Sequence, residues 1–339
     1  MKTTLKILIL FILCLLIWEI ILRNTTYGPT GFIDHDVLGK IYKKGTYVHG
    51  SEGYSRSKFN SLGFRGSELT DRNPGLLRIL ALGDSYTEAL QVNEKYTFCN
   101  LVKINLSKKL DQNVEVINAG RSSASPAYYI HLSEFYINTV SPDAVIIQLN
   151  KGDISGDFYD SYNNFYVVRN NSGFSTVQNK NFISNMPFIQ KHPAMSIIFD
   201  SAVLRLGYFK IQKSYRLRID KQTPQSPQVP SDYRDRIKWM LSSFKEHYED
   251  PIVWFIPDID FYNDNNEFSV IETELETASN HIGINYLNTR NALYSYYRKN
   301  KQTPVGFNNT SPWKGHLNPE GHRVVAELLT ERILKHINR

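Results

Sequence analysis

The chain has 339 residues, of which 41% are hydrophobic, so it is long enough to bury a substantial core and is expected to be globular. Its formal net charge is +6, but acidic residues occur along the whole sequence, and the densest basic stretch, residues 210–221, has helical spacing without a nucleic-acid-binding motif. A nucleic-acid partner is therefore not expected, and a solvated helix face or attraction to anionic lipid or glycan is the preferred interpretation of this stretch.

An apolar run near the N-terminus predicts an export signal or a membrane anchor. Lys2 and Lys6 precede this run, residues 7–22, and Arg23 follows it. The run is slightly short for a hydrocarbon core of ~30 Å, but flanking Lys and Arg side chains can snorkel to the interface. Since no small-residue cleavage site follows, residues 1–23 are predicted to be an uncleaved signal anchor. Positive charge before the run places the N-terminus in the cytoplasm and the rest of the chain outside.

Residues 24–75 are rich in Gly, Tyr, Ser and Asn and predict an irregular lead-in segment with short strands, packed on a domain that spans 76–339. Within that domain, short apolar runs alternate with stretches of helical spacing. The predicted strands are 77–82, 114–119, 143–149, 251–257 and 284–288. The predicted helices are 94–110, 126–139, 232–247, 267–281 and 319–337. This alternation predicts an α/β fold, a three-layer α/β/α sandwich around a mostly parallel five-stranded sheet.

The connection between the third and fourth strands is too long for a simple crossover, so residues 155–230 are predicted to be an insertion. Within it, residues 163–178 have the pattern of a hairpin and 194–217 that of a long amphipathic helix, while 221–232 read as a flexible linker. The insertion lies beside the strand ends, which suggests a lid. Its aromatic side chains predict either a sugar-stacking surface or core packing, and both remain open for Phe165, Tyr166 and Phe174.

Polar residues follow the predicted strands at the edge of the sheet where parallel strands end together and ligands bind. The first strand leads into Gly83-Asp84-Ser85, and a histidine, His316, stands before the last helix. A serine on a strand-to-helix turn is exposed to substrate, and a histidine on a loop can serve as its base. The alternative is that Ser85 caps a helix and His316 binds backbone.

Four sequence blocks carry a resemblance to a known family: residues 61–66 (SLGFRG), 82–89 (LGDSYTEA), 117–120 (INAG) and 316–322 (HLNPEGH). They resemble the SGNH (GDSL-type) hydrolase superfamily, in particular its bacterial membrane-anchored members. The resemblance implies a flavodoxin-like SGNH fold. It also implies that the nucleophile is Ser85, that His316 is the general base and that His322 has a packing or capping role. The oxyanion donors it implies are the N–H groups of Ser85 and Gly120.

A further block of the family, the one after the third strand, departs from the family pattern in this chain. The family places an asparagine followed by an aspartate after the third strand, whereas this chain aligns Gly152-Asp153 there, with Asn150 two residues earlier. We expect Asn150 to serve as an oxyanion donor only if its loop is shifted. Loss of one such donor typically costs about 10²–10³ in rate.

The last block departs as well, because Trp313 and Lys314 occupy the positions where the family has an aspartate before its histidine. An aspartate orients the imidazole and stabilises its charged form. Substitutes could be a backbone carbonyl near Pro312 or the carboxylates of Asp258 or Asp260 at the end of the fourth strand. A Ser–His dyad without a carboxylate is the simpler working hypothesis.

These expectations favour a bacterial inner-membrane, single-pass esterase with a periplasmic or extracellular domain, which removes acetyl or other short acyl groups from an envelope glycan. The same acyl-enzyme could instead transfer the acyl group to a polysaccharide hydroxyl. The departures after the third strand and before His316 motivate a third possibility, a weak or inactive binding or scaffold protein. The chemistry of the first two requires no metal or cofactor, and the expected partners are an acylated glycan or other ester and the membrane.

Overall fold

The computed structural model describes residues 2–25, 32–156, 158–159, 164–171, 173–179, 201–219 and 229–337. Its centre is a five-stranded parallel sheet in the order β11-β10-β7-β5-β6. The strands are β5 (Leu76–Leu82), β6 (Asn113–Asn118), β7 (Ala144–Leu149), β10 (Ile252–Phe255) and β11 (Asn285–Asn288). The chain adds β6 on one side of β5 and then crosses to add β7 on the other side, so the strand order reverses at β5. In open α/β sheets a crevice forms at the carboxyl ends of the strands at such a point.

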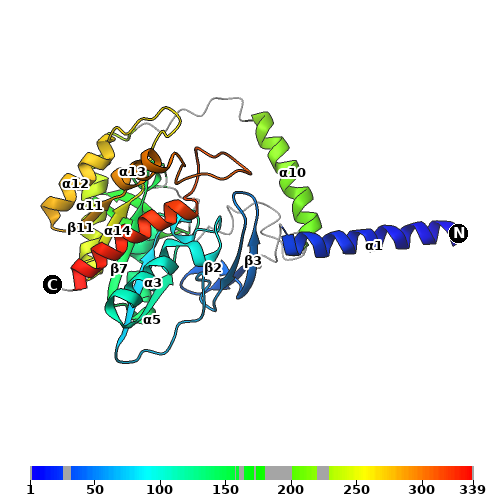
Figure 1. Ribbon diagram of the computed structural model, residues 1–339, viewed down its shortest axis with the longest axis horizontal. Coiled ribbons are helices and arrows are strands. Elements are labelled where there is room, and N and C mark those ends of the chain that lie inside the picture. Colours follow the sequence, from blue (N-terminus) through cyan, green and yellow to red (C-terminus); the bar gives the residue numbers. More distant parts are fainter. Residues whose placement is uncertain are drawn as a thin grey trace.

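Helices cover both faces of this sheet (Figure 1). On one face, β5 residues such as Ile79 pack against α3 (Phe98–Leu110), α13 (Arg290–Asn300) and α14 (Pro319–Ile337). On the other, residues such as Leu80 pack against α4 (Pro126–His131), α5 (Ser133–Val140), α11 (Tyr233–His247) and α12 (Val270–Ile282). The predicted three-layer α/β/α sandwich and its five strands are therefore confirmed.

The helices differ from the sequence predictions at a few points. The helix predicted at 126–139 is interrupted at Leu132, which separates α4 from α5. The one predicted at 94–110 begins with a short 3-10 turn, η1 (Glu94–Tyr96), and Thr97 then caps α3 by accepting a hydrogen bond from the Asn100 N–H. Helix α13 was not predicted, because its tyrosine-rich sequence has few aliphatic side chains to mark a buried face.

The lead-in segment forms two antiparallel hairpins within 32–59. The first pairs β1 (Phe32–His35) with β2 (Gly39–Tyr42), and the second pairs β3 (Gly45–His49) with β4 (Ser55–Phe59). Side chains of β4 alternate between buried and exposed, as expected for a ribbon with one face on the domain. The segment is thus more regular than the sequence indicated.

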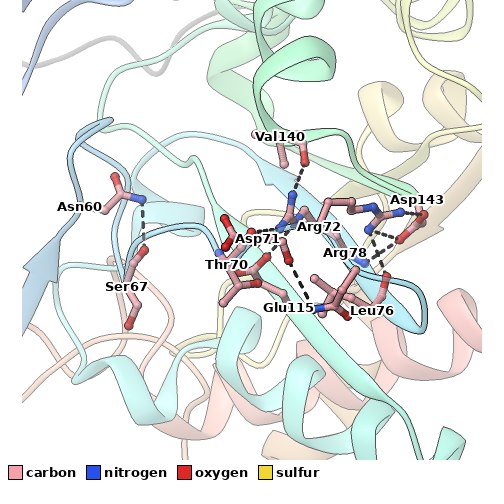
Figure 2. Close-up of polar contacts among 11 residues, drawn as sticks. Asn60, Ser67, Thr70, Asp71, Arg72, Leu76, Arg78, Glu115, Val140 and Asp143 are labelled. Atoms are coloured by element: carbon pink, nitrogen blue, oxygen red, sulfur yellow. Dashed lines mark hydrogen bonds and ion pairs between the residues drawn. The ribbon is translucent and has the colours of Figure 1, made fainter.

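A buried arginine joins the lead-in segment to the amino-terminal end of the sheet (Figure 2). Arg78, on β5, pairs with Glu115 on β6 at 2.7 Å and donates to the carbonyls of Val140 and Thr70. Its own N–H donates to Asp143, which pairs with Arg72. Every charged group in this cluster has a partner, and the cluster lies at the opposite end of β5 from Ser85, so its role is structural.

A second buried arginine, Arg65, holds the turn that follows β5. Its guanidinium donates to the backbone carbonyls of Glu88, Ala89 and Val92, and its N–H donates to the Asn118 carbonyl. The Glu88 and Ala89 carbonyls stand at the end of α2 (Ser85–Glu88), the short helix that follows β5, where helix carbonyls have no partner within the helix. The predicted SLGFRG block therefore fastens the lead-in segment to the helix that carries Ser85.

Replacement of Arg65 by methionine is expected to lower the free energy of unfolding by about 3–5 kcal/mol, because it leaves buried carbonyls without donors. Urea denaturation of the full-length chain in detergent, followed by tryptophan fluorescence, measures the change. Arg323→Met is the control: Arg323 is half-exposed, pairs with Glu320 and Glu327 on its own helix and lies over the Tyr296 ring, so the expected loss is under about 1 kcal/mol. Equal losses of unfolding free energy in the two variants would show that Arg65 contributes no more to stability than a surface arginine.

The insertion is described in part. Its hairpin is formed by β8 (Phe165–Asn170) and β9 (Gly173–Gln178), as predicted for 163–178. The predicted helix at 194–217 is described from residue 201, as α10 (Ala202–Ile219), and most of the predicted linker at 221–232 lies outside the described residues.

The aromatic residues of the hairpin bear on the choice between a sugar-stacking surface and core packing. Phe165 is fully buried against Tyr128, and Phe174 packs edge-on against Phe158. Core packing is thus the role of both phenylalanines, and Tyr166, between them in the hairpin, is partly buried.

Helix α1 (Lys2–Thr25) projects away from the sandwich, and its residues Thr3–Thr25, with a mean hydropathy of 2.8, are long and apolar enough to cross a membrane (Figure 1). Near its carboxyl end, Glu19 pairs with Arg23 at 2.5 Å. The Glu19 carboxylate also accepts from the Ser201 hydroxyl at 2.8 Å and from the N–H groups of Ala202 and Val203. The apolar helix therefore provides the cap for α10 in the insertion.

Candidate active site

Ser85 stands at the first position of α2, directly after the turn Gly83-Asp84 that ends β5. Asp84 caps the helix by accepting from the Tyr86 N–H, and its own N–H donates to the buried Gln148 on β7 at 3.0 Å. A Cβ atom on Gly83 would lie 2.0 Å from the Thr87 hydroxyl oxygen, so this turn requires glycine. The turn is thus fixed by the hydrogen bonds of Asp84 and by the close packing at Gly83, and the Ser85 hydroxyl is presented at the crevice beside β5.

His316 lies on the loop before α14 and points its ring at this serine. The distance from His316 Nε2 to Ser85 Oγ is 2.8 Å, although the two residues are 231 positions apart in the sequence. The ring lies 4.9 Å from that of Tyr86, and the His316 carbonyl accepts from the Gly306 N–H at 2.9 Å. The structure therefore brings together the serine and the histidine that the sequence proposed as nucleophile and base.

The other ring nitrogen of His316 contacts a carboxylate from the lead-in segment. His316 Nδ1 lies 2.6 Å from Glu52 Oε2, and the His316 backbone N–H donates to Glu52 Oε1 at 3.0 Å. Glu52 stands in the loop between β3 and β4. Since an ionised carboxylate only accepts, the proton lies on Nδ1, and Nε2 is left to accept the Ser85 hydroxyl proton. Ser85, His316 and Glu52 form one continuous chain of hydrogen bonds.

Two glycines and one asparagine make room for Glu52 and hold its loop. A Cβ on Gly315, whose φ is +107°, would lie 2.1 Å from Glu52 Oε1. Gly53, with a φ of +65°, donates its N–H to the Asn309 side chain at 2.8 Å, and the Asn309 amide donates back to the carbonyls of Gly53 and Gly50. The loop that carries the acid and the loop that carries the base are therefore tied to each other directly.

The surroundings keep Glu52 ionised. Burial by itself raises the pKa of Glu52, but hydrogen bonds from the His316 ring and backbone outweigh burial and lower the pKa below its ordinary value. The neighbouring His49 is itself desolvated, which lowers its pKa to about 4 and leaves it neutral at neutral pH. A carboxylate facing a histidine is the arrangement that stabilises an imidazolium when one forms.

None of the groups considered from the sequence as partners of His316 contacts its ring in the described part of the chain. Asp260 accepts from the N–H and the side-chain amide of Asn263, at 3.0 and 2.7 Å. Asp258 is exposed, and its carbonyl accepts from Arg290. The carbonyl of Pro312, the other substitute, accepts from the Thr303 hydroxyl. Glu52 is the carboxylate that contacts His316 instead, so neither a substitute at the end of β10 nor a bare dyad describes the site.

Two of the oxyanion donors proposed from the sequence are engaged elsewhere. The Gly120 N–H donates to the Asn118 side chain at 3.0 Å, and a Cβ on Gly120 would lie 2.4 Å from the Glu88 nitrogen, so Gly120 allows β6 to approach α2 closely. The Asn150 amide donates to Asp84 at 2.6 Å, and its oxygen caps α6 (Lys151–Ile154). These residues support the serine turn, whereas the Ser85 N–H has no partner in the described part of the chain.

His322 stays away from the crevice. Its side chain is buried, and Nδ1 accepts from the Phe98 N–H at 3.2 Å while the two rings stack. Burial lowers the pKa of His322 to about 3, so the ring is neutral. It packs α14 against α3 and caps the start of α3, as the sequence expected of this residue.

Sequence reasoning missed Glu52. The residue is flanked by Gly50 and Gly53 between two strands, a local signal for a tight hairpin loop, but nothing in that stretch indicates contact with His316. The two residues are 264 positions apart. Within the described residues, no group of three or more His, Cys, Asp and Glu side chains is arranged to hold a metal ion.

No protein-family model matches the chain, and no curated protein matches it. Among solved structures it is similar to a two-domain esterase active on acetylated mannans, with a TM-score of 0.42 and 13% identity over 77% of this chain and 49% of that one. It is also similar to an acetyl xylan esterase, with a TM-score of 0.43 and 13% identity, covering 75% of this chain and 98% of that one. A catalytic mutant of the acetylxylan esterase Axe2 from Geobacillus stearothermophilus has a TM-score of 0.42 and 13% identity, with 76% of this chain and 94% of that one covered.

The chain thus spans about half the length of the first of these proteins. Identities this low, with TM-scores below 0.5, carry no conclusion about the activity of this chain.

Proposed function

We propose that the chain is a serine hydrolase of carboxylic esters in which Ser85 is the nucleophile, His316 the general base and Glu52 the residue that orients the base. The observation that carries the proposal is the unbroken series of contacts Ser85 Oγ–His316 Nε2 and His316 Nδ1–Glu52 Oε2, at 2.8 and 2.6 Å. A nucleophile, a base within hydrogen-bond reach and a third group that orients the base are the arrangement expected for acyl transfer through a covalent intermediate.

The reaction proceeds in two halves. Ser85 Oγ attacks the acyl carbon while His316 Nε2 takes the hydroxyl proton, and the resulting imidazolium is stabilised by Glu52. His316 then gives this proton to the departing alkoxide, which leaves an acyl-serine and an alcohol. In the second half, His316 deprotonates a water molecule, which attacks the acyl-serine, and the carboxylic acid departs as Ser85 regains a proton. The Ser85 N–H, which has no partner in the described residues, is the oxyanion donor that we assign.

We also propose that α1 anchors the domain at the outer face of a bacterial inner membrane and that the substrate is an O-acylated envelope glycan. The apolar Thr3–Thr25 stretch supports the anchor, and Lys2 and Lys6 at its start support a cytoplasmic N-terminus. In this topology the crevice beside Ser85 faces the compartment that contains the envelope polysaccharides.

A fluorophosphonate probe tests the proposed chemistry, because it phosphonylates only an activated serine. Full-length protein in detergent is expected to be labelled on Ser85, as read by peptide mass spectrometry, and Ser85→Ala is expected to remain unlabelled. Ser122→Ala is a matched control, since Ser122 is a neighbouring serine bonded to the buried Glu88, and it should be labelled like the wild type. No labelling of the wild type at pH 7–8 would instead support an inactive scaffold protein.

A further inference from the structure

A cavity of about 650 Å³ opens next to the triad, between the segment that follows β10 and the loop that carries His316. Tyr86 and Gly315, the immediate neighbours of Ser85 and His316 in sequence, form the wall between this cavity and the triad. The volume is within the range of about 300–1,000 Å³ that is typical of ligand sites. None of the roles proposed for Ser85, His316 and Glu52 uses this cavity.

Two aromatic side chains, Tyr262 and Trp313, stand at the cavity with large exposed fractions, 73% and 38%. Their ring centroids are 6.1 Å apart and the rings are nearly perpendicular, at 83°. In this edge-to-face contact at most one ring face is occupied, and since both side chains remain exposed, flat apolar surface is available to a ligand. Trp313 stands where the family resemblance places an aspartate, a position that the contact between Glu52 and His316 leaves free for another role.

The rest of the wall is polar. Asp258 and Lys314 are exposed side chains that line the cavity, and neither has a hydrogen bond or ion pair among the described residues. Asn263 lines it as well, with its amide nitrogen held by Asp260 at 2.7 Å. An acyl chain in this cavity would desolvate the carboxylate and the ammonium group without replacing their water. A ligand with an apolar face and hydroxyl groups around its edge can pack on the aromatic rings and form hydrogen bonds with the polar side chains.

Both sides of the cavity are preformed. On one side, Asp260 accepts two hydrogen bonds from Asn263 and pairs in an isolated bridge with Asn265. On the other, the loop is closed by backbone hydrogen bonds from Gly306 to His316 and from Phe307 to Ser311. Preformed walls lower the ordering cost of binding.

We infer that this cavity is a subsite for a neutral pyranose residue of an O-acylated glycan, with Tyr262 and Trp313 stacking on its C–H faces and Asp258, Asn263 and Lys314 binding its hydroxyls. The inference rests on the proposed ester hydrolase function and adds the place where a sugar of the substrate binds. It places the sugar beside Tyr86, whose ring centroid lies 4.9 Å from that of His316.

The test compares two kinds of acetate ester, using full-length protein in detergent and release of acetate as the readout. Triacetin is a small ester without a sugar ring, and partly O-acetylated xylopentaose and mannopentaose supply the glycan. Trp313→Ala and Tyr262→Ala are each expected to lower kcat/KM for an oligosaccharide about tenfold and to leave triacetin hydrolysis within twofold of the wild type. Tyr96→Ala, an aromatic residue of 42% exposure outside the cavity, is expected to change neither rate.

A binding measurement separates the subsite from catalysis. In the Ser85→Ala background, calorimetric titration with unacetylated xylopentaose or mannopentaose is expected to show binding that is weakened about tenfold by Trp313→Ala. Unchanged oligosaccharide rates in the two cavity variants, or failure of both oligosaccharides as substrates while triacetin is hydrolysed, would overturn the subsite and leave the esterase proposal intact. Absence of triacetin hydrolysis in the wild type would count against the proposed function, and the titration would still decide the subsite.

Discussion

Glu52→Gln is expected to lower kcat by about 10³–10⁴ while KM changes little. A glutamine amide is close in size to the carboxylate, but it can donate to His316 Nδ1 and then favours the tautomer in which Nε2 carries the proton and cannot accept from Ser85. In serine proteases the equivalent change costs roughly 10⁴ in kcat. Because the pKa of Glu52 is held below its ordinary value, the wild-type group is ionised at neutral pH, and the variant removes that charge without altering an exposed surface.

Glu68→Gln is the matched control for this variant. Glu68 also belongs to the lead-in segment and pairs with Lys44 at the surface, away from His316, so its kcat should equal that of the wild type. Steady-state kinetics on a small acetate ester measures both variants, and a thermal unfolding scan checks that each is folded. A folded Glu52→Gln enzyme with wild-type kcat would remove Glu52 from the mechanism and restore the simple dyad.

Ser85→Ala and His316→Ala are each expected to lower kcat by roughly 10⁶, and the double variant is expected to be no worse than either single one. The reason is that the two groups act as one unit: a serine without its base is a weak nucleophile, and a base without the serine has no proton to take. The distance of 2.8 Å between Nε2 and Oγ is what couples them. Acetate release at high enzyme concentration measures the residual rates.

The rate of the double variant decides whether Ser85 and His316 act as one unit. If the losses in Ser85→Ala and His316→Ala multiplied in the double variant, the two residues would be acting independently, which the geometry does not allow for a nucleophile and its base. A His322→Ala variant serves as the second histidine control, since His322 is buried behind α3 and touches no reacting atom; it should affect stability far more than kcat in the folded fraction.

The sheet could be predicted because its strands are continuous apolar runs, and such runs between helical stretches have few other solutions than a covered parallel sheet. The runs at 77–82 and 143–149 became β5 and β7 with nearly the predicted limits. Helix limits were harder to predict where residue polarity does not change, as at Leu132. Helix α13 was missed because it has tyrosines where a stripe of aliphatic residues would have indicated a buried face.

The candidate site could be predicted only as far as local patterns extend. Ser85 and His316 each lie in a short block whose residue types suggest a role, and the structure places them together. Glu52 could not be found in this way, because the contact with His316 depends on a hairpin whose position on the domain is set by remote contacts such as those of Arg65. Gly120 shows the converse: its block resembles a family motif, but the local hydrogen bond to Asn118 occupies its N–H.

The contact between the loops of Glu52 and His316 also has a consequence for how the chain folds. The acid precedes the base by 264 positions, so their contact closes a long loop of chain and is among the last that folding can complete. In the proposed mechanism, a chain whose two loops have not met has an unactivated serine. Ester hydrolysis by the proposed triad would therefore report that this long-range contact has formed.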